Sequence, residues 1–175
     1  VGLNVAADPL FTLSYTGVNA GMVIVVADDP GMHSSQNEQD SRNYAKASKI
    51  PMLEPADSQE CLSFTKLAYD ISERYDTPVI IRLTTRISHS RSLVEVGERV
   101  DNGLKEYVKD TQKYVMMPAM AKKKHVIVEE RTKALAAWGE SEAIDLGVNK
   151  IEYNDKKIGI ITGGIAYQYA KEALG

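Results

Sequence analysis

Cysteine, long apolar runs and an excess of charge of one sign are all scarce in this chain of 175 residues. The single cysteine, Cys61, excludes an internal disulfide, a cysteine zinc site and an iron–sulfur cluster held by these residues alone. The longest aliphatic run, Met22 to Ala27, is far shorter than the roughly 20 residues that span a bilayer. We therefore expect no membrane-spanning segment and no signal peptide.

The charges nearly balance, with 21 Lys and Arg against 24 Asp and Glu and a formal net charge of −3. Because a dense basic stripe is lacking, we do not expect the chain to bind nucleic acid. Hydrophobic residues make up 43% of the chain and charged residues 26%, which is typical of a folded domain with a sizeable core. The sparing use of cysteine fits a protein of the reducing cytoplasm.

The two ends of the sequence indicate a piece of a longer polypeptide. The chain opens on Val1, directly before a predicted helix, and closes at Gly175, directly after a predicted strand and helix. A lone strand and helix cannot bury their own apolar faces. We therefore expect further elements beyond both ends.

Strand and helix signals alternate through the first two thirds of the chain, which predicts an α/β fold. Residues 22–27 and 79–84 are apolar on both faces, as in the central strands of a parallel sheet. Residues 51–53 are a shorter strand candidate. We therefore predict a parallel sheet with helices on its faces.

Three helices are predicted around these strands. Asp57, with Glu60 three residues later, has the spacing of a capping box before a helix with one apolar face. A second helix is predicted over about 39–49. A third is predicted from a cap at Asp8 to a stop at Gly17.

The composition changes beyond Ser90. Residues 91–117 are polar with weak periodicity, and Pro118 predicts the start of a helix that runs to about Ser141. Residues 151–153 and 158–162 are predicted to form two strands joined by a turn, followed by a helix over about 165–174.

Two polar loops directly follow the two buried strands. Ligands of open parallel sheets bind at the carboxyl ends of the strands. If the strands are parallel, loops 28–40 and 84–90 emerge on the same edge of the sheet. The candidate site residues gathered there are His33, Ser34, Ser35, Gln36, Glu38, Gln39, Asp40, Thr85, Arg86, Ser88 and His89.

A purely structural interpretation of these loops stays open at this point. Arg86 and His89 can be solvated linker residues. Several residues of the first loop are common helix N-caps and can simply begin the next helix, namely Ser34, Ser35, Asn37 and Asp40.

Other kinds of site are excluded by the motifs themselves. The glycines of residues 159–164 lack both the spacing and the lysine of a phosphate loop. No G-x-S-x-G nucleophile elbow occurs. His33 and His89 do not have metal-ligand spacing within one element, so no metal site is predicted in the chain.

Two stretches carry a resemblance to a known family, Met32-His-Ser-Ser-Gln-Asn-Glu-Gln-Asp40 and Thr84-Thr-Arg-Ile-Ser-His-Ser90. The chain resembles the alpha subunits of indolepyruvate ferredoxin oxidoreductases, thiamine-diphosphate enzymes of the 2-oxoacid:ferredoxin oxidoreductase family. The similarity continues through Lys49-Ile-Pro-Met-Leu-Glu-Pro55, Tyr75-Asp-Thr-Pro-Val79 and Lys113-Tyr-Val-Met-Met-Pro118, and spans almost the whole chain.

The resemblance implies a division of the chain into three parts. Residues 1–90 would be the later part of the domain that receives the pyrimidine ring of thiamine diphosphate. Residues 91–149 would be a mostly helical linker, and residues 150–175 would begin a transketolase-C-like domain. The reaction implied is oxidative decarboxylation of an aryl pyruvate on coenzyme A, with electrons passed through iron–sulfur clusters to ferredoxin.

Essential motifs of that family are missing from these residues. They are the glutamate that activates the aminopyrimidine, the G-D-G motif that holds Mg²⁺ and diphosphate, and the cysteine clusters. We expect them on the remainder of the alpha subunit, which would join a second (beta) subunit in a hetero-oligomer. The 175 residues alone are then expected to have no turnover and no tight cofactor affinity.

The resemblance leaves one wall of the site to this chain. Arg42 or Arg86 would pair with the substrate carboxylate, because a guanidinium matches a carboxylate with two hydrogen bonds. His33 or His89 would move a proton near neutral pH. Two alternatives stay open: a relative acting on pyruvate or another 2-oxoacid, and a non-catalytic α/β scaffold module.

Overall fold

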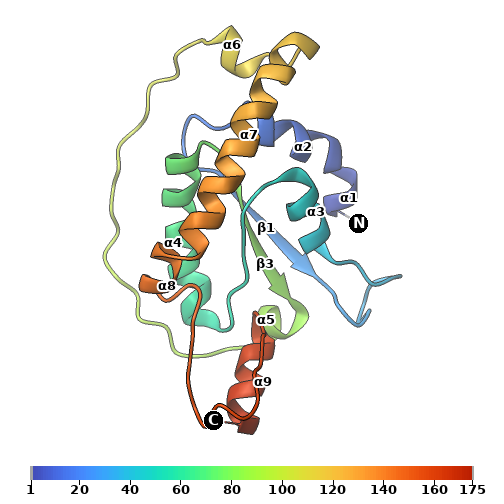
Figure 1. The fold of residues 1–175 in the computed structure, drawn as a ribbon, viewed down its shortest axis with the longest axis vertical. Helices are drawn as coiled ribbons and strands as arrows, with labels where there is room; N and C mark the ends of the chain where they lie inside the picture. Colours follow the sequence, from blue (N-terminus) through green and yellow to red (C-terminus); the bar gives the residue numbers. More distant parts are fainter. Residues whose placement is uncertain (1, 175) are drawn as a thin grey trace.

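The computed structural model describes residues 2–174 and has a parallel sheet between two layers of helices (Figure 1). Its strands are β1 (Val23–Asp28), β2 (Met52–Leu53) and β3 (Val79–Thr84), in the spatial order β1-β3-β2. β1 and β3 pair in register from Val23 opposite Val79 to Asp28 opposite Thr84. All three strands therefore end at one edge, which confirms the predicted parallel α/β fold.

The helices surround this sheet and extend beyond it. No helix within residues 2–174 is both long and apolar enough to cross a membrane. The helices are α1 (Gly2–Val5), α2 (Ala7–Thr16), α3 (Ser41–Ser48), α4 (Ser58–Tyr75), α5 (Thr85–His89), α6 (Thr111–Tyr114), α7 (Pro118–Gly139), α8 (Glu142–Asp145) and α9 (Ile165–Leu174).

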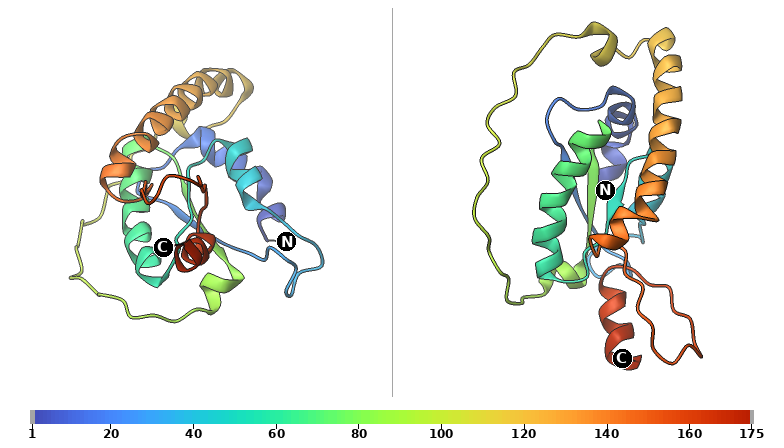
Figure 2. Two further views of the ribbon diagram at one scale, coloured as in Figure 1. Left: turned by 60° about the horizontal axis from the view of Figure 1, so that its bottom comes forward. Right: turned by 60° about the vertical axis from the view of Figure 1, so that its left-hand side comes forward.

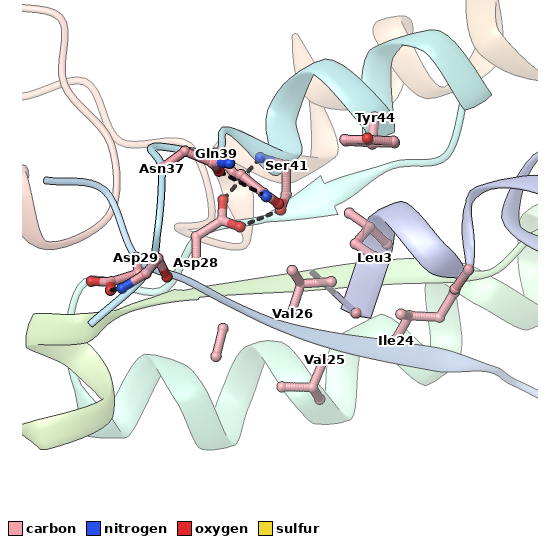
Figure 3. A pocket seen from close by; sticks show the side chains of 14 residues that line it. Leu3, Ile24, Val25, Val26, Asp28, Asp29, Asn37, Gln39, Ser41 and Tyr44 are labelled. Carbon is pink, nitrogen blue, oxygen red and sulfur yellow. Dashed lines mark hydrogen bonds between the residues drawn. The ribbon is translucent and has the colours of Figure 1, made fainter. Parts of the chain in front are cut away.

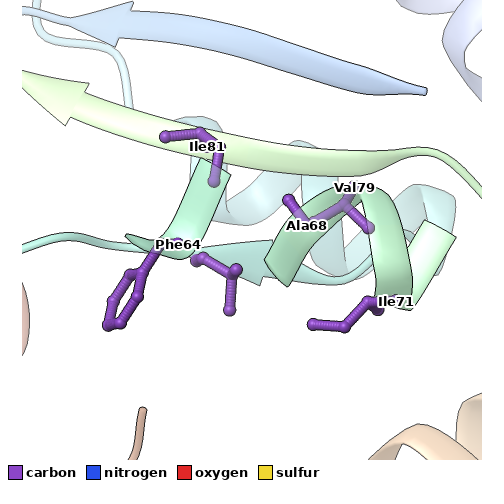
Figure 4. Close-up of a cluster of buried hydrophobic side chains, with 6 residues drawn as sticks. Phe64, Ala68, Ile71, Val79 and Ile81 are labelled. Atoms are coloured by element: carbon purple, nitrogen blue, oxygen red, sulfur yellow. The ribbon is translucent and has the colours of Figure 1, made fainter. Parts of the chain in front are cut away.

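One face of the sheet is covered by α4. This helix begins as its capping pattern predicts, because the Asp57 carboxylate accepts a hydrogen bond from the Glu60 amide at 2.8 Å. Figure 4 shows the resulting core, in which one face of the helix meets alternate residues of β3. The buried side chains are Leu53, Phe64, Ala68, Ile71, Val79 and Ile81, with Leu135 and Trp138 of α7 packed against them.

The opposite face is covered by α2 and α3, through a second core of Leu10, Ala45, Ile50 and Ile80. The prediction that Asp8 caps α2 is wrong: the helix begins after Ala6 and Asp8 lies in its first turn. The chain enters α2 from the helical turn of α1, and the Ala6 amide already bonds to the Gly2 carbonyl. Backbone carbonyls of the preceding turn accept these hydrogen bonds in place of a side-chain cap.

The end of the molecule opposite the strand carboxyl ends is held together around Asp76. The Asp76 carboxylate accepts hydrogen bonds from the Val18 amide and the Lys113 ammonium, both at 2.8 Å. Arg131 of α7 is buried and donates to the Asp76 and Ser14 carbonyls at 2.9 and 2.5 Å. These bonds fix α7 against α2 and the end of α4.

Two strands predicted near the end of the chain are not formed. Residues 151–153 and 158–162 form no strand, although α9 follows where a helix was predicted. A strand needs a hydrogen-bonded neighbour, and within residues 2–174 these segments have none.

Residues 91–110 have no regular structure and arch past α4 from α5 to α6 (Figures 1 and 2). The proposed division at residues 90 and 149 stays a prediction.

Candidate functional site

A buried arginine joins the carboxyl ends of all three strands. Arg82 lies in β3 two residues after Ile80, on the side of the sheet that α3 covers, and is only 7% exposed. Its Nε donates to Asp28 at the end of β1 at 2.6 Å, and its Nη1 pairs with Glu54 directly after β2. Its Nη2 lies 3.8 Å from the Asp40 carboxylate at the start of α3. One side chain thus holds both ends of the loop between β1 and α3.

The Arg82 guanidinium keeps its positive charge despite its burial. Burial by itself lowers the pKa of a guanidinium, but the hydrogen bonds to Asp28 and Glu54 outweigh it and raise the pKa of Arg82. Asp28 is also bonded by Ser41, whose hydroxyl and amide both donate to it. The buried charges are therefore paired, as their stability in a core requires.

Asp29 ties the first polar loop to the second. Its carboxylate accepts a hydrogen bond from the Thr85 hydroxyl at 2.6 Å and from the Ser34 and Ser35 amides at 2.7 and 2.9 Å. The Thr85 hydroxyl, followed by the Ser34 amide, lowers the pKa of Asp29 far below its usual range. The predicted convergence of the two loops is present at this carboxylate.

The end of the first loop is a helix cap. Asp40 accepts a hydrogen bond from the Arg42 amide at 3.0 Å and caps α3, as the structural interpretation of the loop predicts. The Arg42 guanidinium also donates hydrogen bonds to the Asp40 carboxylate, from Nε at 2.8 Å and from Nη2 at 2.7 Å. These bonds lower the pKa of Asp40. The Nε and Nη2 edge of the Arg42 guanidinium is therefore engaged within the chain.

Most of the predicted site residues are exposed at this edge. Arg86 lies on α5 with its side chain exposed, and no ion pair within residues 2–174 involves it. His33 lies over Gly31, and no hydrogen bond within the described chain joins it to His89. The exposed set is His33, Ser34, Ser35, Gln36, Glu38, Arg42, Arg86, Ser88 and His89, whereas Gln39, Asp40 and Thr85 are half-buried.

A groove of about 300 Å³ runs beside the first loop (Figure 3). Its floor is β1, and its walls come from α1, the end of the loop and the start of α3. In Figure 3, Leu3 and Tyr44 stand over Val26, while Val25 points to the other side of the strand. The groove thus follows β1 rather than opening between the histidines.

Comparison with known proteins identifies the family. A family model described as pyruvate flavodoxin/ferredoxin oxidoreductase, thiamine diphosphate-binding, matches residues 15–145. The chain belongs to this family. The match begins within α2 and ends at the last residue of α8, so it includes both polar loops and the whole sheet.

Relatives within the family share nearly half of their aligned residues with this chain. An indolepyruvate oxidoreductase subunit IorA of Archaeoglobus fulgidus is 43% identical over 99% of the chain. Proteins of the same name from Methanothermobacter thermautotrophicus and Pyrococcus abyssi are 42% and 45% identical over 99% of it. The chain covers only 27–28% of the length of these relatives. No solved structure is significantly similar to it.

In this member of a thiamine-diphosphate-binding family, the sheet edge is rich in hydrogen-bonding groups. Hydroxyl, amide and imidazole groups at the sheet edge can donate hydrogen bonds to a polar cofactor or substrate. Within residues 2–174 no cluster of three or more His, Cys, Asp or Glu side chains is suited to hold a metal ion. The residues present therefore fit one wall of such a site and not its metal anchor.

The residues that hold the two polar loops together were not predicted from the sequence. Asp28, Asp29, Glu54 and Arg82 were not among the candidates, although their contacts organise both loops. One signal was visible, because Arg82 is a charge inside a run of buried apolar residues. A buried charge requires carboxylate partners, and Asp28-Asp29 and Glu54 directly follow the neighbouring strands.

Proposed function

We propose that this chain forms one wall of the active site of an indolepyruvate oxidoreductase subunit. The observation that carries the proposal is the 42–45% identity to IorA subunits across 99% of the chain. The complete enzyme would break the bond between the carboxylate and keto carbons of an aryl pyruvate such as indolepyruvate. Carbon dioxide and the thiol proton of coenzyme A are released, the acyl group passes to the coenzyme A sulfur, and two electrons pass to ferredoxin.

The chain's own residues would bind and orient the reactants. When bound, thiamine diphosphate supplies the nucleophile and the electron sink for this cleavage. Ser34, Ser35 and Gln36 would hydrogen-bond the cofactor or the substrate from the first loop, and Ser88 would do so from α5. His33 or His89 takes up or releases a proton, because an imidazole nitrogen can both donate and accept one. Mg²⁺, the iron–sulfur clusters and the beta subunit belong to the remainder of the complete enzyme.

Arg86 is the better candidate for the substrate carboxylate. Arg42 is already bound to Asp40 through its Nε and Nη2, so turning its guanidinium toward a substrate would break this ion pair. Arg86 is exposed at the same edge, one residue after the Thr85 hydroxyl that Asp29 binds. We therefore assign the substrate carboxylate to Arg86.

The experiment is a kinetic assay of the complete subunit with its partner subunit, coenzyme A and ferredoxin. We expect ferredoxin reduction with indolepyruvate at a kcat/KM well above that with pyruvate. A preference for pyruvate or 2-oxoglutarate contradicts the assigned substrate class. No oxoacid-dependent reduction at all, from enzyme loaded with cofactor and clusters, contradicts the enzymatic function.

Arg86 is tested in the same assay. Arg86→Ala should raise the KM for indolepyruvate about tenfold or more, because a charged hydrogen bond contributes about 1.5–3 kcal/mol. Arg42→Ala is the matched control and should leave KM within a factor of about two, since its ion pair with Asp40 is exposed and weak. Equal effects of the two substitutions would remove Arg86 from its role.

A further inference from the structure

Met32 is the only large hydrophobic side chain between Ala27 and Tyr44, in a loop that is otherwise polar. It lies at the edge of the sheet where the strands end, and it is 51% exposed. A single exposed apolar side chain is ordinary on a protein surface and by itself indicates no function. The backbone of Met32 supplies a second and independent observation.

This backbone has a conformation that bulky residues rarely adopt. The φ of Met32 is +57°, in the left-handed region, where a side chain crowds the following carbonyl. Lys49 and Asp76 are also left-handed, but they end α3 and α4, where this conformation is usual. Met32 ends no helix. Strain of this kind persists only where the surrounding contacts impose it, and such positions gather at functional sites.

The contacts that impose the conformation come from Asp29. The Met32 amide donates to the Asp29 carbonyl at 3.1 Å and closes a turn over residues 29–32. The Asp29 carboxylate accepts hydrogen bonds from the Ser34 and Ser35 amides at 2.7 and 2.9 Å. One residue thus holds the chain on both sides of Met32 and fixes where its side chain begins.

Asp29 also ties Met32 to the residue assigned to the substrate. Its carboxylate accepts a hydrogen bond from the Thr85 hydroxyl at 2.6 Å, and Thr85 directly precedes Arg86. A single carboxylate therefore sets the placement of a cation and of an apolar side chain at the same edge of the sheet. An aryl pyruvate carries the matching groups, a carboxylate and an aromatic ring.

We propose that Met32 contacts the aryl ring of the substrate and determines the preference for aryl pyruvates over pyruvate. This inference rests on the proposed function of the chain. A thioether is flexible and polarisable, and it makes favourable contacts with the edges of aromatic rings. Pyruvate has a hydrogen atom in place of the ring and would gain little from Met32.

The selectivity of the complete enzyme, assayed with its partner subunit, coenzyme A and ferredoxin, tests the contact. Met32→Ala should lower kcat/KM for indolepyruvate about tenfold, as for one lost hydrophobic contact, and kcat/KM for pyruvate by no more than about twofold. Met32→Leu keeps an apolar side chain of similar size and should recover most of the loss with indolepyruvate.

Met117→Ala is the matched control. Met117 is 54% exposed and makes no side-chain cap hydrogen bond at the start of α7. The start of α7 lies at the far end of the molecule from α5 (Figure 1). Met117→Ala should therefore leave kcat/KM unchanged with both substrates. A loss of selectivity equal to that of Met32→Ala would show that the effect is not specific to the loop.

Met32→Gly separates the contact from folding. Glycine adopts the left-handed conformation without strain, so the Tm of the complete subunit should stay the same or rise. Its selectivity for indolepyruvate should nevertheless fall as in Met32→Ala. A lower Tm together with equal losses on both substrates would show that Met32 packs against the remainder of the polypeptide, and would overturn the inference.

Failure of this inference and failure of the proposed function give different results. An unsubstituted enzyme that does not oxidise aryl pyruvates contradicts both. An unsubstituted enzyme that prefers indolepyruvate, with a Met32→Ala variant that keeps this preference, contradicts the role of Met32 alone.

Discussion

At the scale of single residues, Arg82 is buried and lies near three carboxylates, those of Asp28, Asp40 and Glu54. Removing it would leave the buried Asp28 carboxylate without its countercharge, and breaking a buried pair in this way costs about 3–5 kcal/mol. We expect Arg82→Met to lower the free energy of unfolding by about 3 kcal/mol or more, measured by urea denaturation.

The control for Arg82 is Arg42→Met, which removes an exposed ion pair to Asp40 at the same edge. Its expected cost is below about 1 kcal/mol, because water and salt screen exposed pairs. Equal losses for the two variants would show that the Arg82 network contributes little beyond an ordinary surface pair.

Asp29 should make the first polar loop, residues 28–40, resistant to acid. Its lowered pKa means that its contribution to stability is complete above about pH 4, the ordinary value for the unfolded chain. The contribution declines as the pH falls below that value and is lost once the pH passes below the lowered pKa. The Ser34 and Ser35 amide shifts should therefore stay constant from pH 7 to about pH 4 in an NMR titration.

Asp29→Asn should loosen the same loop at neutral pH, because a neutral amide oxygen accepts hydrogen bonds more weakly than a carboxylate. We expect faster hydrogen exchange at Ser34 and Ser35. Glu38→Gln, an exposed substitution in the same loop, should leave these rates unchanged. Unchanged exchange in Asp29→Asn would mean that the loop is held by other contacts.

At the scale of secondary-structure elements, α7 is attached through Arg131. The Arg131 guanidinium donates to the Ser14 carbonyl in a buried environment and to the Asp76 carbonyl in a partly buried one. We expect Arg131→Leu to destabilise the chain by about 2–3 kcal/mol, because charged hydrogen bonds are lost and buried carbonyls are left unpaired. Thermal unfolding should show this loss, whereas Lys133→Leu, an exposed change on the same helix, should shift the Tm little.

Elements with a strong local signal were predictable from the sequence. The Asp57 cap and the apolar spacing after it predicted α4, and Pro118 predicted the start of α7. Strands depend on distant partners, so apolar runs at 22–27 and 79–84 became strands, while 158–162, which have no strand neighbour among residues 2–174, did not. The candidate loops were found because they follow strands. The Arg82 partners were not, since a pattern of burial does not specify which distant carboxylates a side chain reaches.

At the scale of the whole molecule, the exposed site predicts weak binding by these residues alone. The polar loops are mostly exposed, and the groove beside them is open. Calorimetry of the 175-residue chain with thiamine diphosphate and Mg²⁺ should give no saturable heat signal. The complete subunit, measured in parallel, should bind both. Tight binding by the short chain would contradict the division of the site between this chain and the remainder.

The sheet and α7 keep their relative placement without help from residues 91–110, the segment that connects them along the chain. Lys113, Arg131 and the pair of Arg74 with Glu142 hold the later helices to the earlier ones without it. Lengthening such a connection costs only about 0.6 kcal/mol for each doubling. A chain cut by trypsin at Arg99 should therefore remain one particle in gel filtration. The same position should accept an inserted domain, which makes it a natural place to split or extend the protein.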